Sequence, residues 1–190
     1  FDTLDDMLMK LVEITTLEIG ADRGTIFLND STTGELYSRV AQGNFKREIR
    51  ILNDSGIAGW VFKTGDGTIV NDAYADSRFN PDIDKKTGYV TKSILCVPIR
   101  TVKGDVIGVA QCLNKLKGDF TPDDLKILAA MTTQAAVALR GAQFIEQIQK
   151  NRIQEMQFVD VVSNITSEID LGSLLQKVMA EATRMLNAER

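Results

Sequence analysis

The sequence predicts an α+β fold, in which an antiparallel sheet of about six strands is bracketed by helices. Three observations support this class. Apolar residues keep a helical spacing over the first 20 residues, alternating runs with hairpin patterns then replace it, and a helical spacing returns near residue 121. The chain has 190 residues, of which 44% are hydrophobic and 25% charged, an ordinary globular composition. We therefore expect one compact domain with an extension.

The first helix is predicted by a single apolar stripe at steps of three, four and seven residues. Thr3, which precedes two acidic residues, is a suitable N-cap, and Gly20 is a suitable stop. The stripe consists of Leu4, Leu8, Leu11, Val12, Thr15 and Ile19.

Six short runs with the composition or alternation of strands predict the sheet. Turn residues at 29–34 and 102–104 join two pairs of these runs as hairpins. Pro98 indicates an edge position or a bulge in its strand. The runs are residues 25–28, 35–40, 47–52, 68–70, 93–100 and 105–113.

Two irregular stretches interrupt the predicted sheet. Residues 56–65 have the pattern of a loop that leads into a short helix. The two glycines at its start indicate a tight turn, or a helix start whose backbone N–H groups hold a phosphate. Residues 71–92 are loop-rich and contain several Asp and Asn residues. A long ordered excursion of this kind is usually functional.

A long helix is predicted from Thr121, which caps it, with Pro122 in the first turn and two Asp residues at the positive end of the helix dipole. Its apolar spacing continues towards residue 165, well beyond the length of an ordinary globular helix. This length favours a connecting or coiled-coil helix, and we expect the chain to form a homodimer through it.

The last residues of the chain repeat the pattern of the first. When residues 188–190 are aligned with residues 21–23, each is preceded by an amphipathic segment. We therefore predict a domain over 1–145, a connecting helix over 146–165 and the first helix of a second, truncated copy over 166–190. The chain has no initiator Met, so we expect it to be part of a longer protein. The alignment matches Leu171, Leu175, Lys177 and Thr183 with Leu4, Leu8, Lys10 and Thr16.

Composition excludes several classes of function. The chain has no histidine, which rules out Ser-His-Asp and Cys-His catalysis, His-ligated zinc and a histidine pH switch. Its formal net charge of −4 argues against nucleic acid and anionic membranes as partners. No apolar run approaches the length of a membrane span, and the N-terminus does not resemble a signal peptide. We therefore expect a cytoplasmic protein.

The sequence predicts no catalytic or metal site. Cys96 and Cys112 lie in apolar runs, which favours buried reduced thiols over a disulfide or a reactive thiol. The chain contains no CxxC pair, no GxxxxGK[ST] loop and no GxGxxG fingerprint. No spacing of carboxylates marks a general acid–base pair. We expect a non-enzymatic chain without a metal or cofactor.

One motif resembles a known family. Asn114-Lys115, Phe120 and Asp124 resemble the N-K-(x)n-F-x3-D-E signature of cyclic-nucleotide-binding GAF domains, although Leu125 replaces the final Glu. The resemblance covers about residues 4–145 and looks closest to the tandem GAF domains of cyclic nucleotide phosphodiesterases and cyanobacterial adenylyl cyclases. Residues 23–28, 56–61, 71–79 and 93–99 are also similar to such domains.

The resemblance implies a GAF fold: a six-stranded antiparallel sheet with helices on both faces, the terminal helices on one face and the ligand pocket on the other. It implies that the helix after Gly56 and the excursion at 72–92 enclose the ligand. It also implies that Lys115 and Asp124 form a structural salt bridge between the last strand and the long helix. The implied ligand-binding residues are Arg23, Thr25, Ala41, Gln42, Ile57, Ala58, Asp84, Thr87, Thr91 and Gln111.

Several of these positions also have an ordinary structural interpretation. Arg23 suits an exposed junction between helix and strand, and Thr25 is a common strand residue. Asp84 and Thr87 are frequent in turns. Gln111 interrupts an apolar strand, where a polar side chain needs a partner, and this favours a position facing the pocket.

We therefore expect a regulatory module that binds a cyclic nucleotide, cAMP rather than cGMP, and controls an attached output domain such as an adenylyl cyclase. The helix start at Ile57 and Ala58, together with Arg23, would neutralise the cyclic phosphate. Closure of the excursion would be the switch, and the long helix would transmit it.

Two alternatives belong to other classes of function. One is a GAF module that senses another small molecule or a chromophore, and the other is a structural dimerisation module without a ligand. Bilin-binding relatives use a cysteine beside a histidine, so the absence of histidine disfavours the chromophore.

Overall fold

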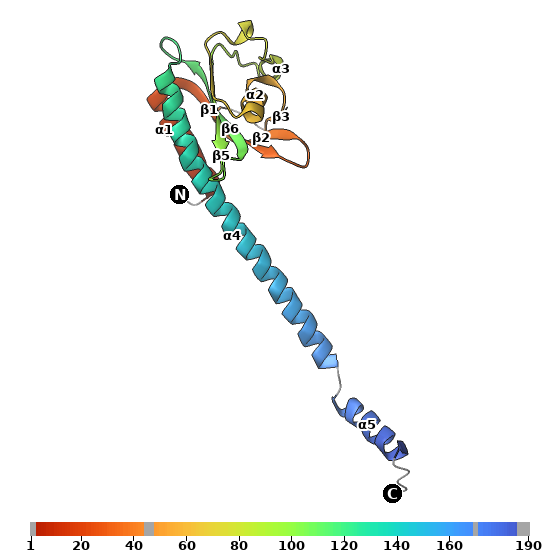
Figure 1. Cartoon of the computed structure of the whole chain (residues 1–190). Helices are drawn as coiled ribbons and strands as arrows, with labels where there is room; N and C mark the ends of the chain where they lie inside the picture. Colours follow the sequence, from red (N-terminus) through yellow and green to blue (C-terminus); the bar gives the residue numbers. More distant parts are fainter. Residues whose placement is uncertain (1–2, 44–47, 169–170, 186–190) are drawn as a thin grey trace. The chain divides into compact units, whose positions relative to one another are not determined.

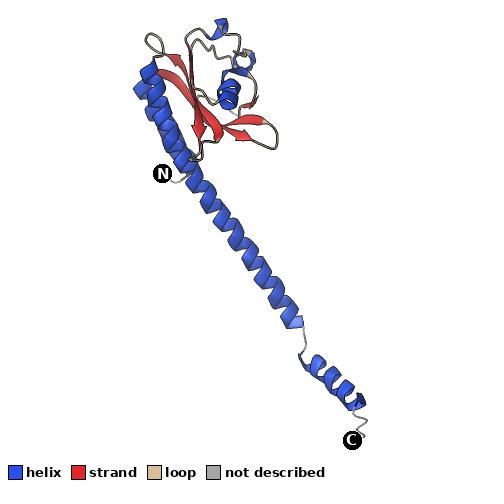
Figure 2. Ribbon diagram, viewed as in Figure 1, coloured by secondary structure: helices blue, strands red, loops and turns tan. Residues whose placement is uncertain are grey.

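The computed structural model describes residues 3–43, 48–168 and 171–185. Its six strands form one antiparallel sheet in the order β3-β2-β1-β6-β5-β4, and helices cover both faces of it (Figures 1 and 2). The predicted α+β class is confirmed. In chain order the elements are α1 (Leu4–Ile19), β1 (Ala21–Asp30), β2 (Glu35–Ala41), β3 (Arg50–Leu52), α2 (Gly56–Thr64), β4 (Thr68–Val70), the 3-10 turn η1 (Ala73–Ala75), α3 (Asp82–Thr87), β5 (Ile94–Arg100), β6 (Val106–Lys115), α4 (Pro122–Glu168) and α5 (Leu171–Met185).

The chain divides into two compact units, residues 1–142 and residues 143–190. The first contains the whole sheet, and the second contains the rest of α4 and all of α5. The segment predicted as a connecting helix, 146–165, is continuous with the rest of α4. Among the described residues, no helix has a stretch apolar enough to cross a membrane.

The ends of α1 are set by the local signals that the sequence contains. The Thr3 hydroxyl accepts a hydrogen bond from the backbone N–H of Asp6 at 3.1 Å, as an N-cap does. Gly20 ends the helix in the left-handed conformation, with φ of 70°. Both predicted caps are confirmed.

Two strands differ by more than two residues in length from their predictions. β1 runs over residues 21–30 instead of 25–28, because its first half pairs with β6 from Ala21 onwards. β3 covers only Arg50–Leu52 instead of 47–52, because β2 offers it three partners at the edge of the sheet. Arg47 lies outside the described residues.

The strand that contains Pro98 explains how a proline fits the sheet. β4 pairs with β5 only as far as Cys96, so the backbone of Pro98 meets β6 alone, opposite Val109. The register shifts by a bulge between Ile99 and Arg100. The proline therefore occupies a locally open edge beside a bulge, which agrees with both parts of the prediction.

The sheet separates two hydrophobic cores. Residues of β5 alternate between them: Leu95 and Val97 pack with α1 and α4, whereas Ile94 and Cys96 pack with α2. The first core also contains Leu8, Val12, Ile19, Ile26, Leu128 and Ala135. The second core contains Phe27, Leu36, Ile57, Ala58, Val61 and Val109. The face with the smaller core carries the pocket described below.

A largely buried ion pair joins the last strand to the helix layer. The Lys115 ammonium lies 2.9 and 2.8 Å from the two carboxylate oxygens of Asp124, and it also donates to the carbonyl of Ile19 at the end of α1. Asp124 also accepts hydrogen bonds from the backbone N–H and the hydroxyl of Thr121. Burial acts to raise the pKa of Asp124, but the bonds from Lys115 and Thr121 outweigh it and keep that pKa below its usual range.

We expect Lys115→Met to lower the free energy of unfolding by about 3 kcal/mol, because it leaves the Asp124 carboxylate buried without its counter-charge. Chemical denaturation measures the change. The double variant Lys115→Met/Asp124→Leu removes both charges and should recover part of the loss. A single variant as stable as the wild type would contradict the importance of this pair.

Candidate functional site

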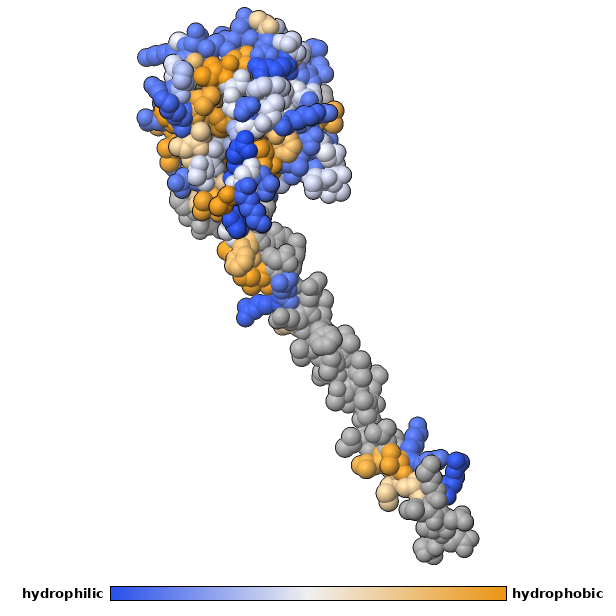
Figure 3. Space-filling view, in the orientation of Figure 1, coloured by the Kyte–Doolittle hydropathy of each residue, from blue (hydrophilic) through white to orange (hydrophobic). Residues whose placement is uncertain are grey.

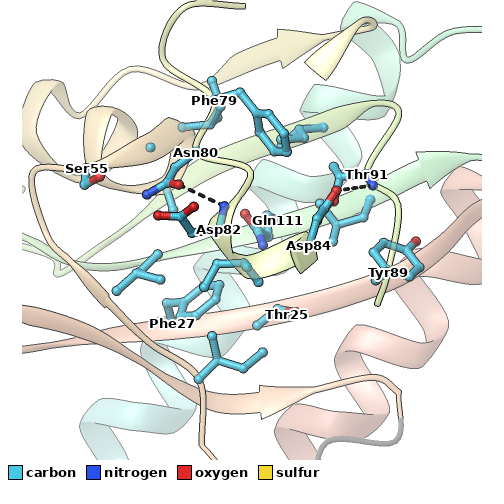
Figure 4. A pocket seen from close by; sticks show the side chains of 18 of the residues that line it. Thr25, Phe27, Ser55, Phe79, Asn80, Asp82, Asp84, Tyr89, Thr91 and Gln111 are labelled. Carbon is cyan, nitrogen blue, oxygen red and sulfur yellow. Dashed lines mark hydrogen bonds between the residues drawn. The ribbon is translucent and has the colours of Figure 1, made fainter. Parts of the chain in front are cut away.

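A cavity of about 300 Å³ lies over the sheet on the face that carries α2. Its floor is the sheet, and its walls come from the start of α2 and from α3 with the segment that follows it (Figure 4). Ligand pockets for small molecules begin at about this volume. We refer to residues 71–92, which run from β4 to β5 and supply the outer wall, as the lid.

The floor of the pocket follows from the strand register. Directly paired residues of antiparallel strands carry their side chains on the same face. Arg23 pairs with Leu113, and Thr25 pairs with Gln111. Phe27 follows two residues further along β1, on the side of α2. The floor is therefore charged at one end, polar in the middle and aromatic at the other end.

Thr25 and Gln111 present polar groups to the pocket (Figure 4). Thr25 is 5% exposed, and Gln111 is half-buried in an otherwise apolar strand. Neither side chain has a hydrogen-bond partner among the residues that the structure describes, and the cavity is the space in front of them. Polar groups in such a position are available to a ligand.

The start of α2 forms one end of the pocket. Gly56 begins the helix with φ of 72°, and the Ser55 side chain makes no capping bond, so it does not occupy the first N–H groups. Gly59 lets the helix approach the preceding loop, since a Cβ there would lie 2.8 Å from the carbonyl carbon of Asp54. Ile57 and Ala58 line the cavity. The positive end of a nine-residue helix thus borders the pocket.

The lid is held together around one carboxylate. Asp84, which is 7% exposed, accepts hydrogen bonds from the backbone N–H and the hydroxyl of Thr91, each at 2.7 Å. It accepts a third from the hydroxyl of Tyr74 at 3.0 Å. Burial and this bond raise the pKa of Tyr74. We call residues 88–92, the last part of the lid before β5, the return of the lid. Asp84 therefore ties this return to α3 and to η1.

The two ends of the lid are fastened to the end of β6 and to the segment that follows it. The Asn114 side chain accepts from the backbone N–H of Lys92 at 2.6 Å and donates to the carbonyl of Val90 at 2.8 Å. At the start of the lid, the Asn71 side chain accepts from the backbone N–H of Phe120 at 2.9 Å. Asn114 and Phe120, two residues of the motif described above, thus anchor the lid.

Arg23 lies at the end of the pocket far from α2. Its guanidinium carbon is 4.1 Å from the ring centre of Tyr89. In Figure 4 Tyr89 and Ser55 lie on opposite sides of the pocket. Along β1, residues 24–26 separate Arg23 from Phe27, which packs with α2. The expectation that Arg23 and the start of α2 hold one phosphate together therefore stays a prediction.

Eight of the ten predicted ligand-binding residues line the cavity. Ala41 does not; it ends β2 opposite Thr25. Thr87 ends α3, and its side chain lies outside the described residues, so its assignment stays a prediction. Gln42 lines the cavity, but its side-chain oxygen accepts a hydrogen bond from the backbone N–H of Gly24 at 2.7 Å. The eight are Arg23, Thr25, Gln42, Ile57, Ala58, Asp84, Thr91 and Gln111.

Several pocket residues were not predicted from the sequence. Tyr89 and Phe79 come from the lid, and Phe27 comes from the floor. Phe27 alternates with Thr25 along the strand, so the pattern contained a signal for it. Tyr89 and Phe79 had no comparable signal, because the direction of a side chain in an irregular segment depends on tertiary contacts.

The two cysteines are free thiols that form no disulfide. Cys96 and Cys112 are both buried and free, as predicted, and burial raises the pKa of the Cys112 thiol to about 12. The alternation described above puts them on opposite faces of the sheet. Within the described residues, no group of three or more His, Cys, Asp or Glu side chains suits a metal ion.

A family model described as "GAF domain" matches residues 3–139. Among curated relatives, a probable 3′,5′-cyclic phosphodiesterase of Caenorhabditis elegans is 35% identical over 161 residues, which are 78% of this chain and 22% of the relative. A dual 3′,5′-cyclic-AMP and -GMP phosphodiesterase 11A of Takifugu rubripes is 32% identical over 98% of this chain and 22% of the relative. The chain thus spans less than a quarter of the length of these proteins.

Solved structures share the fold. The GAF domain of a phosphoenolpyruvate-protein phosphotransferase from Coxiella burnetii has a TM-score of 0.69 at 18% identity, covering 77% of this chain and 88% of that one. The GAF domain of the Acinetobacter phosphotransferase has a TM-score of 0.66 at 19% identity, covering 77% and 87%.

The hydrogen bonds that Asp84 accepts in the lid can be tested by mutation. Asp84→Ala should lower the free energy of unfolding by about 2 kcal/mol, because it leaves three donors without their acceptor. Asp82→Ala, on the same helix, removes an exposed carboxylate 3.2 Å from Lys85 and should change stability by less than about 0.5 kcal/mol. Thermal unfolding of both variants measures the difference, and equal effects would contradict the role of Asp84.

Proposed function

The chain belongs to the GAF domain family, and from this premise we propose that its first unit is a regulatory module that binds a cyclic nucleotide. The observation that carries the proposal is the pair of polar side chains, Thr25 and Gln111, that face a cavity of about 300 Å³ without partners in the described part of the chain. The relatives named above are phosphodiesterases of cyclic nucleotides.

We propose that the cyclic phosphate sits at the start of α2. The first-turn N–H groups of Ile57 and Ala58 border the cavity, and a helix start favours an anion without a basic side chain. The base then extends towards Thr25, Gln111 and the Arg23 end of the floor. The proposal thus assigns Arg23 to the base and not to the phosphate.

Our proposal for the ligand is cAMP, with cGMP as the alternative. The curated relatives include both a dual cyclic-AMP and -GMP phosphodiesterase and cGMP-specific phosphodiesterases, such as one of Drosophila pseudoobscura pseudoobscura that is 34% identical over 98% of this chain and 18% of the relative. Their names therefore do not select one nucleotide, and binding measurements must do so.

We propose that the module controls an output domain outside this chain, through α4. An adenylyl cyclase is the output expected from the sequence, and a phosphodiesterase is the output that the relatives carry in their names. We also propose a cytoplasmic location for the module. In both cases the chain itself is regulatory and not catalytic.

We also propose that α5 is the first helix of a second copy of the domain. Leu8 and Val12 of α1 are 0% and 2% exposed against the sheet, whereas their counterparts Leu175 and Met179 are 56% and 65% exposed. Figure 3 shows apolar side chains gathered on α5. The Thr183 hydroxyl donates to the carbonyl four residues earlier, as that of Thr16 does in α1. The apolar face of α5 would pack on a sheet of its own.

The second unit also supports a homodimer. Exposed apolar side chains follow α4 beyond residue 142, where a coiled-coil partner would cover them. They are Phe144, Ile145, Ile148, Ile153 and Met156. This observation favours the structural dimerisation module as the second candidate function.

Calorimetric titration of the chain with cAMP and cGMP tests the proposal. We expect cAMP to bind with a dissociation constant in the micromolar range, roughly −8 kcal/mol, and cGMP to bind more weakly. 5′-AMP, whose phosphate carries more charge and is not cyclised, serves as the control. A chain that dimerises in sedimentation experiments but binds neither nucleotide at about millimolar concentration would favour the dimerisation module.

Thr25→Val tests the pocket floor. We expect it to weaken nucleotide binding by roughly tenfold, because a hydrogen bond to the ligand is lost, and to leave the ligand-free protein at least as stable. The control is Thr132→Val, an identical change at a residue equally buried at 5% exposure, whose hydroxyl bonds to Ala129 within α4. Unchanged affinity in Thr25→Val would remove Thr25 from the site.

A further inference from the structure

Three side chains join the return of the lid to the start of β1. The Tyr89 hydroxyl donates to a carboxylate oxygen of Asp22 at 2.7 Å, across 67 residues of sequence. The Arg23 guanidinium lies against the Tyr89 ring, 4.1 Å from its centre, and its Nε is 3.7 Å from the Asp22 carboxylate. Each of the three therefore contacts the other two.

The cluster borders the pocket without filling it. Arg23 and Tyr89 line the cavity, whereas Asp22 does not. Figure 4 shows Tyr89 at the edge of the pocket, next to Asp84 and Thr91 of the lid. The bond between Tyr89 and Asp22 thus lies on the outer side, where it can be removed without taking away a group that faces the ligand.

We propose that Asp22, Arg23 and Tyr89 form a latch that closes the lid over the pocket, with Tyr89 as the positioning residue that holds Arg23. The other anchors of the return, from Asp84 and Asn114, hold it to the rest of the lid and to the end of β6. The hydroxyl of Tyr89 fastens it to Asp22 of β1. A ligand that enters or leaves at this end must break that bond.

Charge supports the same arrangement. Asp22 compensates the charge of Arg23, and the Asp84 carboxylate also lines this part of the pocket, so the latched end suits a neutral base better than a phosphate. Burial and the Asp22 carboxylate raise the pKa of Tyr89, although Arg23 acts in the opposite direction. The hydroxyl therefore remains a donor at neutral pH.

The first test needs no ligand. In Tyr89→Phe, hydrogen–deuterium exchange at the amides of Gly88, Thr91 and Lys92, which are bonded to Asp84 and Asn114, should be roughly three- to tenfold faster than in the wild type. Asp22→Ala should have the same effect, and the double variant should add little to either. Unchanged exchange in Tyr89→Phe, or additive effects, would overturn the latch.

Tyr37→Phe is the matched control. Tyr37 lies on β2 beside Arg50, does not line the pocket, and its hydroxyl has no hydrogen-bond partner in the part of the chain that the structure describes. Its exchange pattern should match that of the wild type. A similar acceleration in this variant would show that loss of any tyrosine hydroxyl loosens the domain.

The second test rests on the proposed function and uses cAMP, with cGMP in parallel. Dissociation from Tyr89→Phe should be roughly three- to tenfold faster, with a much smaller change in the association rate. An unchanged dissociation rate would overturn the latch even if exchange is faster. If neither nucleotide binds the wild type, the proposed function fails, and the exchange experiment still decides the latch.

Discussion

The fold of the first unit depends on two adjacent residues at the end of β6. Asn114 bonds to the return of the lid, whereas Lys115 bonds to Asp124 of α4 and to the last carbonyl of α1. Asn114 adopts φ of 55°, a conformation that costs roughly 1 kcal/mol for a residue other than glycine, and its side-chain bonds offset this cost. One strand end thus fixes the lid on one side of the sheet and the helices on the other.

The same segment supplies a physical connection between the pocket and α4. Asn71 at the start of the lid bonds to the backbone of Phe120, and Asn114 bonds to its end. Thr121 and Asp124, which follow directly, form the first turn of α4 and its ion pair. A change in the position of the lid therefore acts on the residues from which α4 begins. A switch requires an element with two discrete arrangements that connects the ligand site to the output. The lid and the segment at 114–124 provide that connection.

The parts of the fold that could be predicted from the sequence depend on local chemistry. The Thr3 cap, the Gly20 stop and the polar Gln111 in an apolar strand each carry their signal within a few residues. The position of Arg23 does not, because its contact with Tyr89 requires the lid to return over β1. The Gln42 side chain likewise bonds to Gly24 across a strand pair. Register and lid conformation are tertiary properties, so the sequence alone does not place Arg23 relative to the start of α2.

Net charge proves to be a weak guide to what this pocket accepts. The chain carries a formal charge of −4, yet the start of α2 borders the cavity with backbone N–H groups, whose partial positive charge is independent of side chains. At the far end, Arg23 is balanced by Asp22, and the Asp84 carboxylate also lines the cavity there. The start of α2 can therefore accept an anion, whereas the far end favours a neutral group. A ligand with a single phosphate at one end and an uncharged ring at the other matches this distribution, whereas a polyanion does not.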